Sequence, residues 1–309
     1  MQKWQKKGLI YCTDGSALWS RSHAQVPVVL DMPSCWRIYY ATRNEAGQSS
    51  ISFIDVTKGR PENILYCHSK PVFESGKIGA FDDCGVMPSS FIQKDDKIFM
   101  YYIGWSVRST IPYHNSIGLA VSSEGNSFKR VFEGPIVAPN HLEPYFTGTS
   151  WVMNDEGVFR MWYLSCTRWD CTDSGKYEPA YHIKYAESKD GITWTREGAV
   201  AIDYKENEMA IANACVIKEL SLYKMWYCYR GGADYRTNPN TSYKIGYAES
   251  VNAKEWLRKD EEVDLSTSHD GWDSTMLAYP NVIKHDGKLY LFYNGNGFGK
   301  SGFGYAILN

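Results

Sequence analysis

Carboxylates recur along this chain, each a few residues ahead of a short apolar segment. Acidic side chains held in pairs can carry out general acid/base chemistry when their surroundings raise the pKa of one of them. The candidate catalytic groups are therefore the acids before the second, third and fourth such segments: Asp82, Asp83, Glu143 and Glu208. A turn cap or a solvated surface charge is the structural alternative for each of them.

A second set of residues has the composition of a polyol-binding site. Arginines bind carboxylates, phosphates or pairs of hydroxyls, and aromatic faces can stack on the C–H surfaces of sugars. The candidates for substrate binding are His23, Gln25, Arg43, Trp105, Arg168, Trp169, Glu178, Arg230 and Asp273. A histidine satisfied by the backbone, or a tryptophan that only holds its loop in place, is the alternative interpretation.

A repeat of about 62 residues must position these groups. Five aromatic segments of the Met-Trp-Tyr type recur, and their last aromatic residues are 62, 61, 64 and 66 positions apart: Tyr40, Tyr102, Tyr163, Tyr227 and Tyr293. One short apolar segment precedes each of them and another follows, with turns rich in Asp, Asn and Gly between them. Such β-branched and aromatic runs predict strands, and no stretch of helical periodicity competes.

Three clear strands and a weaker fourth in each repeat predict an all-β fold, a five-bladed β-propeller with four antiparallel strands per blade. The chain ends on the third strand of the fifth repeat, whereas residues 8–11 form an unassigned strand. We predict that this N-terminal strand closes the last blade, because closure pairs sheet edges that would otherwise stay open. Residues 1–309 are predicted to form a single domain.

Loop length indicates which rim of the propeller carries function. The connections between the second and third strands are long in repeats two to four, at 102–117, 163–183 and 227–245, whereas the other turns are tight. Binding and catalytic residues concentrate on long loops held by a rigid scaffold. The segments that lead into the first strands end on the same rim, so we expect the candidate residues to surround the mouth of one central channel.

This arrangement resembles the five-bladed β-propeller glycosidases, the superfamily of glycoside hydrolase families 43, 32, 62 and 130. At the level of architecture, the resemblance covers the whole sequence. It implies a carbohydrate-active enzyme that cleaves a glycosidic linkage by acid/base chemistry, with inversion in families 43 and 62. Carried over by position, Asp82 or Asp83 and Glu143 are candidates for the base or its supporting carboxylate, and Glu208 is the candidate general acid.

One position departs from the pattern of that superfamily. The first strand begins Ser22-His23-Ala24-Gln25, where those hydrolases place an Asp within an Asn-Asp-Pro-like motif. Either an Asp of the second blade or His23 then takes the role of base, or the protein does not hydrolyse glycosides. Two alternatives stay open. One is a glycosyltransferase or tailoring enzyme of polysaccharide or glycoconjugate biosynthesis that uses an activated sugar, and the other is a non-catalytic carbohydrate-binding propeller.

Composition argues against several other classes of protein. Thirty-three Lys and Arg against 35 Asp and Glu give a formal charge of −2, with no basic excess for a nucleic acid or an acidic membrane. The first residues lack the pattern of an export signal, and no apolar run approaches the ~18 residues of a membrane span, so we expect a cytoplasmic location. Histidine spacing predicts no metal site and no cofactor, although some propellers of this type hold a Ca²⁺ in the channel. The expected partner is a carbohydrate or sugar phosphate.

Overall fold

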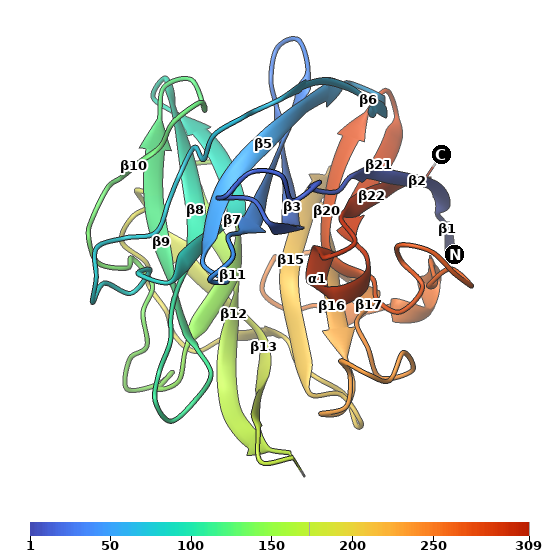
Figure 1. Cartoon of the computed structure of the whole chain (residues 1–309). Coiled ribbons are helices and arrows are strands. Elements are labelled where there is room, and N and C mark those ends of the chain that lie inside the picture. The colour runs from blue at the N-terminus through green and yellow to red at the C-terminus, as the bar shows by residue number, and fades with distance from the viewer. Residues whose placement is uncertain (173, 309) are drawn as a thin grey trace.

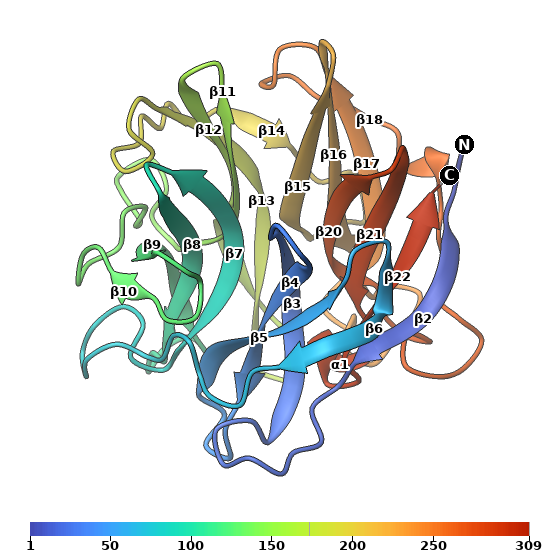
Figure 2. The same cartoon turned by 90° about the horizontal axis from the view of Figure 1, so that it is seen from above.

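The regular secondary structure of the chain is almost entirely β-strand, which confirms the predicted all-β class. The computed structural model describes residues 1–172 and 174–308, and within them most strands pair antiparallel in five groups of four (Figures 1 and 2). One parallel residue pair joins the first group to the second, and another joins the third to the fourth. The groups are β3 (Ser22–Asp31), β4 (Trp36–Arg43), β5 (Ser49–Thr57) and β6 (Arg60–Cys67); β7 (Gly85–Lys94), β8 (Lys97–Ser106), β9 (His114–Ser122) and β10 (Lys129–Arg130); β11 (Thr147–Asp155), β12 (Val158–Cys171), β13 (Tyr177–Ser188) and β14 (Val200–Ile202); β15 (Ala210–Glu219), β16 (Leu222–Arg230), β17 (Lys244–Ser250) and β18 (Leu257–Arg258); and β20 (Ala278–His285), β21 (Lys288–Asn294), β22 (Phe303–Leu308) and β2 (Gln5–Tyr11).

The N-terminal strand joins the last group, as predicted. β2 pairs antiparallel with β22, and the two chain ends lie on the same side of the molecule (Figures 1 and 2). The remaining elements are short: β1 (Gln2–Lys3) pairs in parallel with β19 (Val263–Asp264), η1 covers Asp260–Glu262, and α1 (Asn296–Gly299) is a helical turn between β21 and β22. The glycine-rich residues 295–299 around α1 therefore connect two strands of the last group.

The first strands of the groups surround a common centre. β3, β7, β11, β15 and β20 contact one another in this order, and β20 contacts β3 again (Figure 1). Hydrogen bonds join neighbours: Ser89 Oγ donates to Ser150 O (2.7 Å), Asn213 Nδ2 to Pro280 O (2.9 Å) and Val29 N to Asn281 Oδ1 (3.1 Å). Residues far apart in the sequence are thereby brought to one place.

The repeated aromatic residues pack one group of strands against the next. Tyr39 Oη donates to Gly125 O, Tyr101 Oη to Gly191 O and Trp162 Nε1 to Ala253 O, at 2.8 to 2.9 Å. Each acceptor lies in the turn after the third strand of the following group. These side chains are fully buried, so their regular spacing reflects the packing of successive sheets, as expected for a core.

The third group departs from the expected loop. Residues between Tyr163 and Ile183 were expected to form the longest loop, but β12 and β13 continue as a hairpin to Cys171 and from Tyr177. Arg168, Trp169 and Glu178 therefore lie on strands. Pairing between β12 and β13 fixes their positions; Glu178, for example, lies opposite Asp170. The length of the connection in the sequence does not reveal this pairing.

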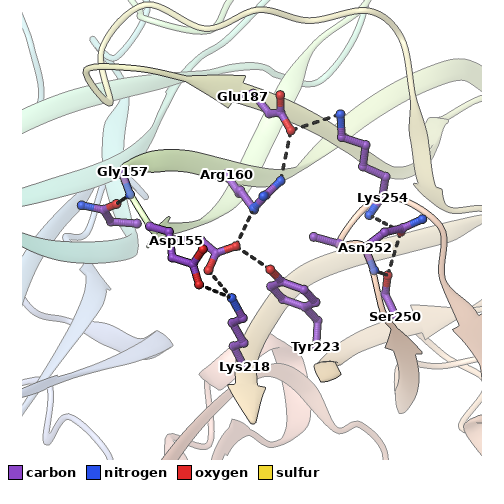
Figure 3. A network of polar contacts seen from close by, with 12 residues as sticks. Asp155, Gly157, Arg160, Glu187, Lys218, Tyr223, Ser250, Asn252 and Lys254 are labelled. Atoms are coloured by element: carbon purple, nitrogen blue, oxygen red, sulfur yellow. Dashed lines mark hydrogen bonds and ion pairs between the residues drawn. The ribbon is translucent and has the colours of Figure 1, made fainter. Parts of the chain in front are cut away.

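A polar network joins the third and fourth groups at the C-terminal ends of their first strands, β11 and β15 (Figure 3). Asp155, the last residue of β11, accepts from Arg160 (2.9 Å), Lys218 (2.6 Å) and Tyr223. Arg160 continues the network to Glu187 (3.0 Å), which also pairs with Lys254. Burial would raise the pKa of Asp155, but its hydrogen bonds with Lys218, Tyr223 and Arg160 outweigh that effect and lower the pKa to about 2. We refer to these residues as the Asp155 network.

Candidate functional site

A cavity of about 230 Å³ lies where the first strands begin. Each of the five first strands contributes to its lining through Gln25, Met87, Thr149, Ala212 and Tyr279. The cavity lies at the opposite end of these strands from the Asp155 network, since Asp155 follows Thr149 by six positions along β11, or roughly 20 Å of extended chain. We refer to it as the central cavity.

A β-bulge in each first strand shapes the lining. The pairing of every first strand with its second strand shifts register close to the lining residue. In three of the strands a non-glycine residue has a left-handed backbone there: Val26 (φ 54°), Asn213 (φ 57°) and Tyr279 (φ 54°). Bulges turn side chains away from the regular alternation of a strand, and strained backbone of this kind is concentrated at functional sites.

Aromatic and amide side chains on or directly before three of the third strands also line the cavity. Each of these third strands has an isoleucine at the same position of the repeat, namely Ile117, Ile183 and Ile245. The residues two positions before them, Asn115, Tyr181 and Tyr243, all line the cavity. The hydroxyls of Tyr181 and Tyr243 hydrogen bond to each other. Sequence analysis missed this row, although aligning the third strands of the repeats would have placed the three residues at equivalent positions.

Three predicted binding residues line the central cavity: Gln25, Arg43 and Trp105. The Arg43 Nε donates to Gln25 Oε1 (2.9 Å), and Trp105 Nε1 donates to Ser49 Oγ (2.8 Å). Burial lowers the pKa of Arg43, and nearby Arg236 lowers it further. Arg43 and Trp105 occupy equivalent positions, three residues after the last aromatic of their repeats, which explains why both reach the same place.

Three more predicted residues lie directly behind this lining. Glu178 accepts from Tyr235 Oη (3.0 Å) and pairs with Arg236 (2.8 Å), and both of these partners line the cavity. Arg230 is 1% exposed, and its guanidinium lies 3.9 Å from the centre of the Tyr235 ring. His23, at the start of β3, has its pKa lowered to about 4 by burial and by the nearby charges of Arg43 and Lys300.

Arg168 and Trp169, two more of the predicted binding residues, lie away from the cavity lining. Arg168 pairs with Asp170 (2.9 Å) and donates to Tyr204 Oη (2.9 Å). Trp169 packs against Tyr113 and Phe146 with ring centres 5.5 Å apart, so it supports residues of the lining from outside. Arg168 is thus held by its own neighbour Asp170 away from the central cavity, and Trp169 packs in the way described by its structural alternative.

The predicted catalytic carboxylates do not meet around the central cavity. Two of them, Asp82 and Glu143, and the predicted binding residue Asp273 each accept a hydrogen bond from the last aromatic of their own repeat, Tyr102 (3.1 Å), Tyr163 (2.8 Å) and Tyr293 (2.9 Å). A cation faces each carboxylate: Arg130 and Lys6 at 2.7 and 2.6 Å from Asp82 and Asp273, and Arg196 at 3.6 Å from Glu143. All three carboxylates are at most 3% exposed. The recurrence that suggested catalysis therefore coincides with a repeated tyrosine–carboxylate–cation contact that ties the strands of a group together.

Glu208 and Asp83 have different surroundings again. Glu208 forms a bidentate pair with Arg258 (2.7 and 2.9 Å) and accepts from the Lys205 backbone. Asp83 accepts from Gly79 N (3.0 Å) and lines a separate, open hollow near His114. Among the described residues, none of the four predicted catalytic acids lines the central cavity and only Asp83 lines this hollow, so the expectation that they share the pocket at the channel mouth is corrected.

Two known proteins are similar to this chain over nearly its whole length. The chain is 37% identical to "Uncharacterized protein MT1551" and 36% identical to "Uncharacterized protein Rv1502", both of Mycobacterium tuberculosis, over 99% of the chain and 99% of each relative. This protein belongs to the family of these two proteins. No model of an established protein family matches this chain.

Several solved structures, among them glycoside hydrolases, share the fold of this chain. One match is a complex of BT0996 with RGII (TM-score 0.74, 19% identity, 99% of this chain and 91% of the other), and another is a thermostable family-43 glycoside hydrolase (TM-score 0.63, 18% identity, 93% and 88%). A structure described for the GH130 family of mannoside phosphorylases also matches (TM-score 0.71, 14% identity, 100% and 94%). The resemblance to propeller glycosidases is thereby supported at the level of fold.

Two further observations concern ions and membranes. Among residues 1–172 and 174–308, no three His, Cys, Asp or Glu side chains gather in a way that could hold a metal ion. In the same residues, no helix has the length and apolar character needed to cross a membrane.

Proposed function

We propose that this protein is a carbohydrate-active five-bladed propeller, a single domain whose central cavity binds a saccharide. The observation that carries the proposal is the composition of that one cavity, to which all five first strands contribute. Trp105 and several tyrosines offer aromatic faces, while Gln25, Asn115 and Thr149 offer hydrogen-bonding groups. Apolar walls with a few placed polar groups are the usual composition of a small-molecule site, and the volume of about 230 Å³ lies just below the ~300 Å³ at the small end of such sites.

The position of the acids decides which chemistry this cavity can support. Cleavage of a glycosidic bond by two carboxyls needs them roughly 5–9.5 Å apart on either side of that bond. Within the described residues, no Asp or Glu lines the cavity, and Glu178 is the carboxylate that contacts its lining residues. Inverting hydrolysis by Glu208 and Asp83 therefore has no support from the geometry, and we assign any acid/base step at this cavity to Glu178.

A binding protein without hydrolytic activity is the second candidate function. It is favoured by the absence of a carboxylate pair from the cavity lining within the described residues. Neither candidate requires a cofactor. The two are separated by whether a bound saccharide is converted.

The proposal is tested by titrating the protein with a panel of mono- and disaccharides in a calorimeter and by assaying release of reducing sugar from those that bind. Trp105→Ala should weaken binding by about tenfold, because it removes an aromatic wall of the cavity. Trp256→Ala, a half-buried tryptophan that packs against Trp162 away from the cavity, is the matched control and should bind normally. If no saccharide binds, or if Trp105→Ala binds as well as the wild type, the proposed site is wrong.

Turnover distinguishes the two candidates. If reducing sugar is released, Glu178→Gln should abolish the release while Glu208→Gln leaves it intact. Binding without any release identifies the binding protein. Loss of turnover in Glu208→Gln, with unchanged folding, would return the catalytic role to the sequence prediction.

A further inference from the structure

We propose that the saccharide of the central cavity carries an anionic group, a carboxylate or a phosphate, and that Arg43 binds this group. The inference rests on the proposed carbohydrate-binding function and adds the chemical class of the ligand. It follows from an excess of positive charge that the protein leaves uncompensated at this one place.

Three guanidinium groups stand at the central cavity, and one carboxylate accompanies them. Arg43 and Arg236 line the cavity, and Arg230 lies behind the tyrosines of its wall. Glu178 pairs with Arg236. In the described part of the chain, neither Arg43 nor Arg230 has a carboxylate within salt-bridge distance, so two of the three positive charges have no counter-charge from the protein.

Arg43 is the group that can reach a ligand. Its Nε donates to Gln25 Oε1, and its two terminal nitrogens make no hydrogen bond with other described residues. The terminal edge of a guanidinium matches the two oxygens of a carboxylate or phosphate. Arg230, by contrast, donates to the backbone oxygens of Pro179 (2.7 Å) and Gly231 (3.3 Å) and is covered by Tyr235. Arg230 therefore adds positive charge to the site, but its guanidinium has no free edge that could bind a ligand.

The tyrosines and the histidine at the cavity do not supply the missing negative charge. Burial raises the pKa of Tyr113, Tyr243 and Tyr279, so their hydroxyls stay neutral at pH 7. His23 is neutral as well, and Lys300 beside it is a further cation. The field at the cavity is therefore positive, and an anion would be attracted to it.

Arginines of similar burial elsewhere in the described chain are paired with carboxylates. They are Arg37 with Asp55, Arg130 with Asp82, Arg160 with Asp155, Arg168 with Asp170, Arg196 with Glu143 and Arg258 with Glu208. An unpaired buried charge is costly, and the protein avoids it at all of these places. The exception at the cavity is explained if a ligand provides the counter-charge.

Binding of glucose, glucuronate, glucose 6-phosphate and inorganic phosphate to the wild-type protein tests the inference. Glucose is the neutral probe, the next two probes place a carboxylate or a phosphate on the same ring, and phosphate is the anion alone. At least one anionic sugar should bind roughly tenfold or more tightly than glucose, as expected for a charge-assisted contact. The sugar that does so identifies the anionic group.

Arg43→Gln should abolish this preference, so that the anionic sugars bind no better than glucose. Arg60→Gln is the matched control, because Arg60 is exposed, lies outside the cavity lining and changes the net charge equally. Thermal unfolding of both variants verifies that they are folded.

The outcomes separate this inference from the proposed function. If all three sugars bind equally, or if the anionic preference survives in Arg43→Gln, the inference is overturned and the saccharide site stands. If phosphate binds but no sugar does, the anion site is upheld and the proposed function is wrong. If nothing binds, both are wrong.

Discussion

The Asp155 network and the central cavity place cations and tyrosines at opposite ends of the same strands, but they balance charge differently. In the Asp155 network, Arg160 and Lys218 share the Asp155 carboxylate, and Glu187 extends the pairing to Lys254 (Figure 3). At the cavity, Arg43 and Arg230 have no carboxylate partner among the described residues. Compensated charges of the first kind hold sheets together, whereas the uncompensated guanidinium of Arg43 is available to a ligand. The two regions should therefore respond in opposite ways to the loss of a charged group.

The largest expected effect is at the Asp155 network. Asp155→Asn should lower the free energy of unfolding by on the order of 2 kcal/mol, because Arg160 and Lys218 lose their shared buried carboxylate. The measurement is denaturant unfolding at pH 7. Asp96→Asn, an exposed turn position with no described ion pair, should change little. If the two variants are equally stable, the network does not hold the third and fourth groups together.

The same network predicts a dependence of stability on pH. The pKa of Asp155 is about 2 in the folded chain, against an ordinary value of 3.8, so its contribution is present above about pH 4 and is lost as the pH falls towards 2. The stability difference between wild type and Asp155→Asn should therefore shrink between pH 4 and pH 2. A difference that stays constant over this interval would contradict the assignment.

Glu208→Gln should have a smaller effect on stability, roughly 1–2 kcal/mol, since it weakens the bidentate pair with half-buried Arg258. Saccharide binding should be unchanged, because Glu208 is absent from the cavity lining. Unfolding and calorimetry on the same preparation measure the two effects. Weakened binding with intact stability would place Glu208 in the site after all.

The smallest expected effect is at the cavity itself. Arg43→Gln should leave the stability of the ligand-free protein within about 0.5 kcal/mol of the wild type, or raise it, because it removes an uncompensated charge at the expense of one neutral hydrogen bond. Thermal unfolding without added anions measures this. A loss as large as that of Asp155→Asn would mean that Arg43 is a structural charge, and the comparison between the two regions would fail.

Periodicity made much of the fold predictable. The spacing of Tyr40, Tyr102, Tyr163, Tyr227 and Tyr293 located the second strand of every group, and the unmatched residues 8–11 revealed the partner of β22. Such features follow from local residue type and chain order. The continued hairpin of β12 and β13 was not predictable in this way, because pairing across the two strands decides whether a long connection is a loop.

The site was only partly predictable, because a charge in the sequence does not reveal its partner. Asp82 and Asp273 stand where acids were expected, but the buried hydroxyls of Tyr102 and Tyr293 and a cation bind each of them. Arg43 and Arg168 were both candidates for ligand binding, and only the structure shows that Asp170 pairs with Arg168. The row of Asn115, Tyr181 and Tyr243 was missed because the sequence analysis aligned the third strands only from the isoleucine two residues further on.

A crystal structure of the protein soaked with glucose 6-phosphate or glucuronate tests the central claim most directly. The account predicts a sugar ring in the central cavity against Trp105, with its phosphate or carboxylate oxygens about 2.7–2.9 Å from the terminal nitrogens of Arg43. A sugar found instead in the hollow beside Asp83 and His114, with the central cavity free of it, would contradict the account.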